Sequence, residues 1–381
     1  NNTNGVQVTK LTATKALIVF QDAVGGGLMS AVVAEIIGGT VLLGTKRTIY
    51  SAVLSQQRMG VDRLSDTSAI VVFRDNTGAG RTMALGIRGI SIHPVGSTIV
   101  FDSAPVNYVS VTALSPTLAI ACYNSNTSGQ SFGSARAIVI SGTTVTTPTA
   151  AAVFESANTQ WTSVTKLSAT KALVAYRDAG NSHRGTASIL NVSGTTITPV
   201  TPVVFETRSA VSYTNVTTLS ASRALVVYQY SPDGPSFAHA ALLDVSGNTI
   251  TPVTPVQLHS SDGFMAVDTV SSSSAIMRSQ KSTIGVRTHL LVTGSTISVE
   301  LSTTTDMATT TIGDVAQLSD NQAIMVGGHP SSGFAVLIDK LSSPSFVVDQ
   351  FVTTISGSDS IDSTFYADWN STAVTETLNG Q

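Results

Sequence analysis

The residues best suited to chemistry are charged side chains that recur at one place in a repeated pattern. Asp22, the pair Arg74-Asp75 and the pair Arg177-Asp178 each follow a Val- and Ala-rich run. A ring of such loops on one face of a repeated fold could contact a polar or charged ligand. In the alternative interpretation, each aspartate caps its own turn by accepting hydrogen bonds from backbone N–H groups. The sequence leaves both interpretations open.

Signatures of catalysis, metal binding and cofactor binding are missing from the sequence. The six histidines are scattered and form no HExxH pair, which makes a zinc site improbable. The sequence contains no GxSxG, P-loop or GxGxxG motif. A second column of acids, Asp102, Glu155 and Glu206, ends one predicted strand of three repeats, and we expect solvated edge charges there rather than a Ca²⁺ site. We therefore expect no catalytic residue, no metal and no cofactor.

The elements that position these loops belong to a repeat of about 50 residues, a period typical of repeat architectures. Each copy carries an aliphatic anchor, followed five residues later by Ala and then Leu or Ile. The anchors are Leu11, Leu64, Leu114, Leu167, Leu219, Val270 and Leu318.

Each copy contains four runs rich in Val, Ile, Thr and aromatic residues, separated by Ser, Gly, Asn and Asp. Such runs favour strands, and the residues between them favour turns. Four strands in each of seven copies predict an all-β fold, a seven-bladed β-propeller with four antiparallel strands per blade. The fourth run often carries proline, as at Pro199 and Pro252, which places it on an edge strand.

The repeat divides the chain into seven predicted blades and a remainder. The propeller is predicted over 1–357, with blades at about 6–55, 56–103, 104–156, 157–207, 208–259, 260–304 and 305–357. Residues 358–381 look like a further half-repeat that contains Trp369. This half-repeat is expected either to close the ring or to pair with a neighbouring subunit, with Trp369 as the candidate subunit contact.

Composition narrows the classes of partner. Charged residues make up 11% of the chain and the net charge is −3, without a basic run, so we expect no nucleic-acid partner. No apolar run reaches the ~18–20 residues needed to span a bilayer, so no membrane insertion is expected.

Aromatic residues make up 6% of the chain and are not expected to repeat at one loop position. The single cysteine, Cys122, lies in a buried-strand pattern and is expected in the core.

The repeat also resembles a known kind of propeller repeat, best between 109 and 259, in the stretch LSATKALVAYRDAGNSHRGTASILNVSGTTITPVTPVVFE. Similar repeats occur in surface, secreted and phage structural proteins of aquatic bacteria. The resemblance implies a non-enzymatic structural or adhesive propeller at an extracellular, cell-surface or virion location. Its expected partners are other copies of itself or other proteins of an assembly. A carbohydrate-binding lectin or receptor-binding domain that uses the loop ring is the first alternative, and a glycoside-acting enzyme is the second.

Overall fold

The computed structural model describes residues 5–22, 26–52, 59–127, 129–231, 235–261, 263–281, 284–308, 313–329, 332–339 and 347–352. These residues form thirty-two strands and no helix. The predicted half-repeat at 358–381, with Trp369, lies outside the described residues.

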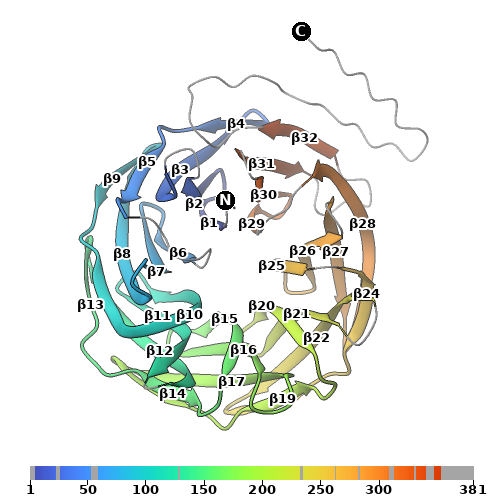
Figure 1. Cartoon of the computed structure of the whole chain (residues 1–381). Coiled ribbons are helices and arrows are strands. Elements are labelled where there is room, and N and C mark those ends of the chain that lie inside the picture. Colours follow the sequence, from blue (N-terminus) through green and yellow to red (C-terminus); the bar gives the residue numbers. More distant parts are fainter. Residues whose placement is uncertain are drawn as a thin grey trace.

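The strands form antiparallel sheets that follow one another around a central axis (Figure 1). In each repeat the first strand lies nearest the axis and the later strands lie successively farther out. The innermost strands are β1 (Val6–Thr12), β6 (Met59–Ser65), the second half of β10 (Ile99–Ser115), β15 (Thr159–Ser168), β20 (Val211–Ser220), β25 (Gly263–Ser271) and β29 (Gly313–Ser319).

The second strand of each repeat is buried on both faces, as its Ala- and Val-rich sequence predicts. The second strands are β2 (Lys15–Asp22), β7 (Ser68–Arg74), β11 (Leu118–Thr127), β16 (Lys171–Asp178), β21 (Arg223–Tyr230), β26 (Ser274–Lys281) and β30 (Gln322–His329). The third strands are β3 (Leu28–Ile37), β8 (Ala79–Arg88), β12 (Gln130–Ser141), β17 (Arg184–Ser193), β22 (Phe237–Ser246), β27 (Ile284–Thr293) and β31 (Ser332–Asp339).

The fourth run forms the outer edge and is broken in most repeats. Its two pieces both pair with the third strand, and Pro199 and Pro252 each end the first piece, so the predicted edge position is confirmed. The outer strands are β4 (Thr40–Leu43) and β5 (Arg47–Tyr50), β9 (Ser91–Val95), β13 (Thr144–Thr146) and β14 (Ala152–Glu155), β18 (Thr196–Pro199) and β19 (Val203–Glu206), β23 (Thr249–Pro252) and β24 (Val256–Ser260), β28 (Thr296–Ala308) and β32 (Val347–Val352).

β10 differs from its counterparts because it runs unbroken through two repeats. Its first half pairs with β8 and its second half pairs with β11. It therefore joins two repeats into one nine-stranded sheet.

Serine and threonine side chains make the turn that follows each innermost strand. In every repeat, the residue after the anchor accepts a hydrogen bond from the backbone N–H two residues later, at 3.2 to 3.4 Å. This local bond favours a tight turn over strand continuation. These seven hydroxyl-bearing residues therefore have a structural role.

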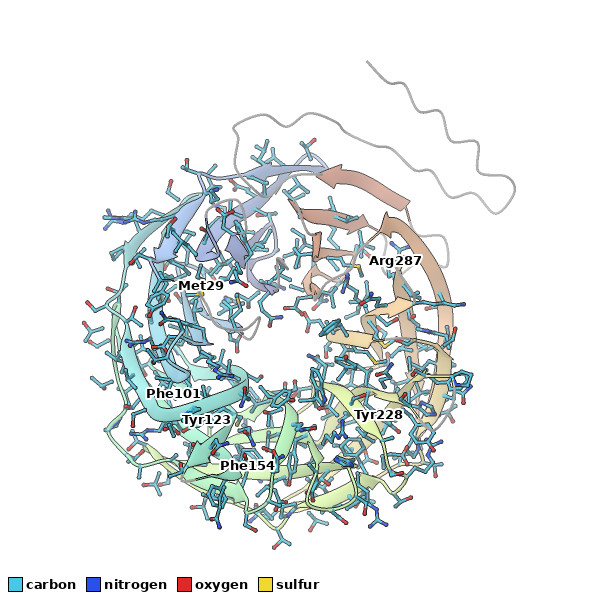
Figure 2. The ribbon with its side chains drawn as sticks, in the orientation of Figure 1. Met29, Phe101, Tyr123, Phe154, Tyr228 and Arg287 are labelled. Carbon is cyan, nitrogen blue, oxygen red and sulfur yellow. The ribbon has the colours of Figure 1, made fainter. Side chains whose placement is uncertain are left out.

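The apolar core is divided among the interfaces between neighbouring repeats. Seven clusters of buried side chains each join two repeats, and one of them joins β1–β3 to β29–β31. Cys122 is fully buried in the cluster between β11 and β16, as predicted. Figure 2 labels several of the large buried side chains, including Met29, Phe101, Tyr123, Phe154 and Tyr228.

The first and last sheets lie side by side. β29 contacts both β25 and β1, and the backbone N–H of Val8 donates to Oδ2 of Asp314 at 3.0 Å. The first and last described sheets are therefore in contact.

Candidate functional site

Four aromatic side chains occupy one position in four successive repeats, at the start of the innermost strands. They are Tyr108, Trp161, Tyr213 and Phe264, on β10, β15, β20 and β25. The sequence-based expectation concerned loop positions, whereas these four residues recur at one position within strands. Counting back from the anchors of the repeat would have found them, because each lies at the same offset.

A β-bulge in each strand sets the direction of these side chains. The pairing register shifts at Asn107/Ser110, Gln160/Ser163, Ser212/Asn215 and Gly263/Ala266, and each shift encloses one of the aromatic residues. Bulges re-aim side chains and are over-represented near functional sites. Tyr108, Trp161 and Tyr213 also have positive φ values of 53°, 55° and 51°. A non-glycine residue with positive φ costs about 1–3 kcal/mol, so this strain is repeated three times at one site.

The four rings contact one another in sequence and form what we call the aromatic arc. Ring centroids lie 5.0 Å apart for Tyr108–Trp161, 4.1 Å for Trp161–Tyr213 and 4.8 Å for Tyr213–Phe264. The rings are tilted against each other by 47° to 60°, and each is half-buried. The arc is therefore a continuous, partly exposed aromatic surface that crosses four repeats.

The aromatic arc lines one side of a cavity of about 140 Å³ near the central axis. The rest of the lining combines apolar side chains such as Met59 and Met265 with polar ones, which include Gln7, Ser163, Asn215 and Asp314. An apolar wall facing a few hydrogen-bonding groups is the usual composition of a small-molecule site. The uneven lining predicts one off-centre ligand rather than one ligand for each repeat.

Hydrogen bonds between neighbouring repeats hold the arc in place. Thr162 Oγ1 donates to the carbonyl oxygen of Tyr108 at 2.5 Å, and Thr214 Oγ1 donates to that of Trp161. Ser163 Oγ accepts a bond from the backbone N–H of Val216 at 3.1 Å. Because each bond links one repeat to the next, the rings are positioned before any ligand arrives.

Carboxyl groups on the innermost strands lie close to the same axis. Burial raises the pKa values of all three groups, Asp62, Asp268 and Asp314. The pKa rises to about 6 for Asp268 and to about 7 for Asp314. Each also accepts a hydrogen bond from a backbone N–H group of a neighbouring repeat. The donors are Ala113 to Asp62 at 2.8 Å, Gln317 to Asp268 at 2.8 Å and Val8 to Asp314 at 3.0 Å. These acids therefore link repeats, and Asp314 also faces the cavity.

The three aspartates of the predicted loop ring have partners within the protein. Asp22 forms an ion pair with Lys46, which lies between β4 and β5, at 2.7 Å. Asp75 accepts hydrogen bonds from the backbone N–H groups of Thr77 and Ala79 at 2.8 and 3.0 Å. Asp178 accepts one from the backbone N–H of Asn181 at 3.0 Å. Their carboxylates thus support loop structure, and a direct ligand contact by any of them stays a prediction.

The two predicted arginines lie beside the aromatic arc. Arg74 Nη1 donates to Oδ1 of Asn107 at 2.5 Å, next to Tyr108 in the sequence. Arg177 pairs in register with Gln160 of β15, next to Trp161 in the sequence. Both side chains are half-buried, and their positions place them near the Tyr108–Trp161 end of the arc.

The prediction of solvated edge charges for the column Asp102, Glu155 and Glu206 is wrong. Glu206 is 3% exposed and accepts a hydrogen bond from Tyr228 Oη at 2.6 Å. Glu155 accepts one from Tyr176 Oη at 3.1 Å, and Asp102 accepts one from Ser125 Oγ at 2.9 Å. Each partner belongs to the following repeat, so these acids join repeats.

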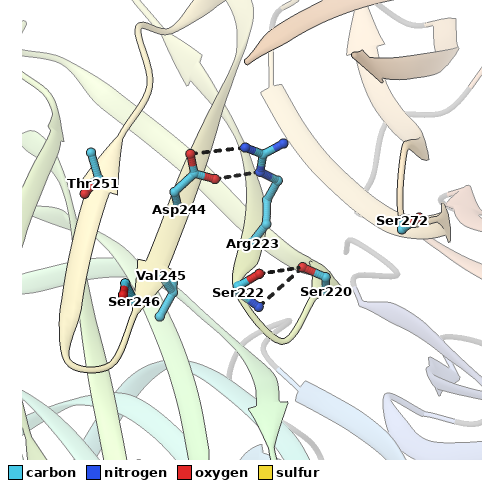
Figure 3. A pocket seen from close by; sticks show the side chains of 8 residues that line it. All are labelled: Ser220, Ser222, Arg223, Asp244, Val245, Ser246, Thr251 and Ser272. Carbon is cyan, nitrogen blue, oxygen red and sulfur yellow. Dashed lines mark hydrogen bonds and ion pairs between the residues drawn. The ribbon is translucent and has the colours of Figure 1, made fainter. Parts of the chain in front are cut away.

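A second hollow of about 530 Å³ lies at the other ends of the strands, between the turns of the fifth and sixth repeats (Figure 3). Arg223 and Asp244 form a two-pronged ion pair in it, with N–O distances of 2.6 and 3.1 Å. Arg223 Nη1 also donates to the carbonyl oxygen of Gly294 at 2.6 Å. The charged side chains of this hollow are therefore already paired with each other. This makes the hollow a weaker candidate site than the aromatic arc.

Within the described part of the chain, no group of three or more His, Cys, Asp or Glu side chains could hold a metal ion. The same residues contain no helix long and apolar enough to cross a membrane.

No family model and no curated protein matches this chain. Solved structures resemble it in fold. The BP39L lectin from Burkholderia pseudomallei has a TM-score of 0.64 and 10% identity, over 88% of this chain and 96% of that chain. A hypothetical selenium-binding protein from Sulfolobus tokodaii has a TM-score of 0.55 and 6% identity, over 89% and 88%. Kluyveromyces lactis Hsv2 has a TM-score of 0.51 and 10% identity, over 88% and 93%.

Identities this low show the fold alone. The lectin and Hsv2 have β-propeller folds, and the strands of this chain are antiparallel and arranged in the same way. The prediction of an all-β, propeller-like fold is therefore confirmed.

Proposed function

We propose that this protein is a non-enzymatic, seven-bladed β-propeller that binds a carbohydrate at the aromatic arc. The blade count is supported by the seven repeats and by the seven apolar clusters between neighbouring repeats. Ring closure is supported by the contact of β1 with β29.

The observation that carries the binding proposal is the contact of four half-buried rings along a cavity that also carries hydrogen-bonding groups. Sugar rings have apolar C–H faces that stack on aromatic side chains and hydroxyl groups that need hydrogen-bond partners. Trp161 and Tyr213 supply the rings, while Gln7 and Asn215 supply amide groups that both donate and accept. The fold is also similar to that of a lectin, which agrees with this ligand class.

The proposal is tested with the full chain on a glycan array, followed by calorimetric titration of the best ligand. We expect Trp161→Ala to weaken binding at least tenfold, because it removes the ring at the centre of the arc. Trp161→Phe serves as the matched control, since it keeps an aromatic ring at the same backbone conformation. Absence of any glycan ligand, or equal binding by the Trp161→Ala variant, would contradict the proposal.

A structural role in a surface or virion assembly is the second candidate function. It is favoured by apolar side chains exposed on outer strands, such as Val153 at 52% and Val299 at 40%. Exposed apolar residues on edge strands favour contacts with other chains. In this role, copies of the protein or other assembly proteins would be the partners, at an extracellular, cell-surface or virion location. Light scattering of the full chain and of a chain ending at residue 357 tests whether 358–381 mediates assembly.

A further inference from the structure

Arg74 and Arg177 occupy equivalent positions in the second and fourth repeats, at the ends of β7 and β16. The repeat between them carries Tyr108. Arg74 donates a hydrogen bond to Asn107, next to Tyr108, and Arg177 pairs in register with Gln160, next to Trp161. Both arginines therefore lie near the Tyr108–Trp161 end of the aromatic arc.

Neither guanidinium has a carboxylate partner among the described residues. No ion pair within 4.0 Å involves Arg74 or Arg177 in the parts of the chain that the structure describes. Asp75 and Asp178 follow them directly, but successive side chains of a strand point to opposite faces. Those two carboxylates bind Thr77 and Asn181 of their own loops instead.

Both charges are partly removed from water. The Nε atoms of Arg74 and Arg177 are buried and make no hydrogen bond with any described residue. Burial also lowers the pKa of Arg177. A desolvated charge without a partner costs free energy, and unpaired charges of this kind are concentrated at functional sites.

Three other arginines have a carboxylate partner. Half-buried Arg81 and Arg223 and exposed Arg208 form ion pairs at 2.5 to 2.6 Å. The fold can therefore supply a counter-charge, which Arg74 and Arg177 lack. Other repeats carry neutral side chains at the same position, namely Gln21, Asn124, Gln229 and Gln280.

We infer that the ligand of the aromatic arc is an acidic saccharide, whose carboxylate or sulfate binds Arg74 and Arg177 beside Tyr108. This inference rests on the proposed carbohydrate site. Planar guanidinium groups bind carboxylates and sulfates through paired N–H donors. The sugar ring then stacks on Trp161 and Tyr213, and the anionic group points toward the Tyr108 end of the arc.

The test is calorimetric titration of the full chain with pairs of probes that differ only in charge. Trigalacturonate is compared with its methyl ester, 3′-sialyllactose with lactose, and lactose 3′-sulfate with lactose. We expect at least one acidic probe to bind tenfold or more tightly than its neutral partner. Preference for the carboxylates or for the sulfate then identifies the anionic group, and either result supports the inference.

The variants Arg74→Gln and Arg177→Gln locate the charge effect. Glutamine occupies this position in other repeats, so the change is compatible with the fold, which a denaturation curve verifies. We expect each variant to lose most of the preference for the acidic probe while it binds the neutral partner normally. Arg88→Gln removes an exposed arginine elsewhere and should leave the preference unchanged.

The outcomes separate this inference from the proposed function. Neutral and acidic probes that bind equally, with binding lost in Trp161→Ala, would overturn the inference and leave the carbohydrate site in place. A charge preference that survives both arginine substitutions would also overturn it. If no probe binds and the glycan array is negative, the proposed function fails and the inference fails with it.

Discussion

Tyr228 of the fifth repeat donates a hydrogen bond from its buried hydroxyl to Glu206 of the fourth repeat, at 2.6 Å. The equivalent pair one repeat earlier is Tyr176 and Glu155, at 3.1 Å. Each tyrosine ring also contacts a phenylalanine of the preceding repeat, with centroids 5.5 Å apart for Phe205–Tyr228 and 5.2 Å for Phe154–Tyr176. The interface between repeats thus combines a charge-assisted hydrogen bond with an aromatic contact.

We expect Tyr228→Phe to destabilise the protein by about 1.5–3 kcal/mol, because a buried hydrogen bond to a carboxylate is lost. The ion pair between Glu206 and Arg208 remains and limits the loss. Urea unfolding followed by fluorescence measures the change. Tyr230→Phe is the matched control on the same strand, since Tyr230 packs against Arg208 through its ring face. Similar losses in the two variants would contradict the role of the Tyr228 hydroxyl.

Glycine at the start of the third strand makes room for a phenylalanine ring of the outer strand. A Cβ atom at Gly185 would lie 2.5 Å from the ring of Phe205, and the same distance separates the Gly133 and Phe154 pair. We expect Gly185→Ala to destabilise the protein by about 1–3 kcal/mol through overpacking. At Gly263 the nearest atom to such a Cβ is 3.8 Å away. Gly263→Ala should therefore leave the urea midpoint unchanged or raise it, and equal losses at both glycines would refute the packing argument.

Much of the architecture follows from the sequence because the local signals repeat. The anchor leucines, the hydroxyl-bearing turns and the prolines of the fourth run each recur, so the strands, their order and the edge position are predictable. The unbroken course of β10 is not, because the stretch between Asp102 and Val106 resembles the end of one repeat and the start of the next. Strand continuity there depends on pairing with both β8 and β11.

The candidate site was only partly predictable. Arg74 and Arg177 stand out by sequence because charge is scarce in this chain. The aromatic arc was missed because Tyr108, Trp161, Tyr213 and Phe264 are three different residue types. Only the bulges and the curvature of the sheet array bring these rings together. Whether Glu206 is solvated could not be predicted, because the partner that buries it comes from the next repeat.

The single cysteine provides a probe of unfolding. Cys122 is fully buried in an apolar cluster, and burial raises the pKa of its thiol. Since thiolates are the reactive form, we expect negligible labelling by a thiol reagent in native buffer. Labelling should reach one equivalent in denaturant, with a midpoint that matches the urea unfolding curve. Fast labelling of the native protein would show that the interface between the third and fourth repeats opens locally.

The carboxyl group of Asp314 should make stability depend on pH. Burial and the charge of Asp268 raise its pKa to about 7, against hydrogen bonds from Val8 and Val315 that lower it. An unfolded aspartate has a pKa of about 4, so between about pH 4 and 7 the folded chain binds more protons than the unfolded chain. The contribution of this group to stability is therefore lost as pH rises through about 7.

Asp314→Asn isolates this effect from the other titrating groups. Burial lowers the pKa values of His183, His239 and His259. Below about pH 6.5 these histidines therefore make the protein more stable as pH rises, whereas Asp314 makes it less stable. The prediction therefore concerns the difference between variant and parent. From pH 5 to pH 8, we expect the free energy of unfolding of the variant to rise by about 1–2 kcal/mol relative to that of the parent. This is less than the raised pKa of Asp314 would give for a fully buried group, because Asp314 retains solvent contact. Asp66→Asn, which changes a carboxylate that is 64% exposed, is the control for the loss of a surface charge. A difference between Asp314→Asn and the parent that stays constant with pH would show that the Asp314 carboxyl group titrates normally in the folded protein.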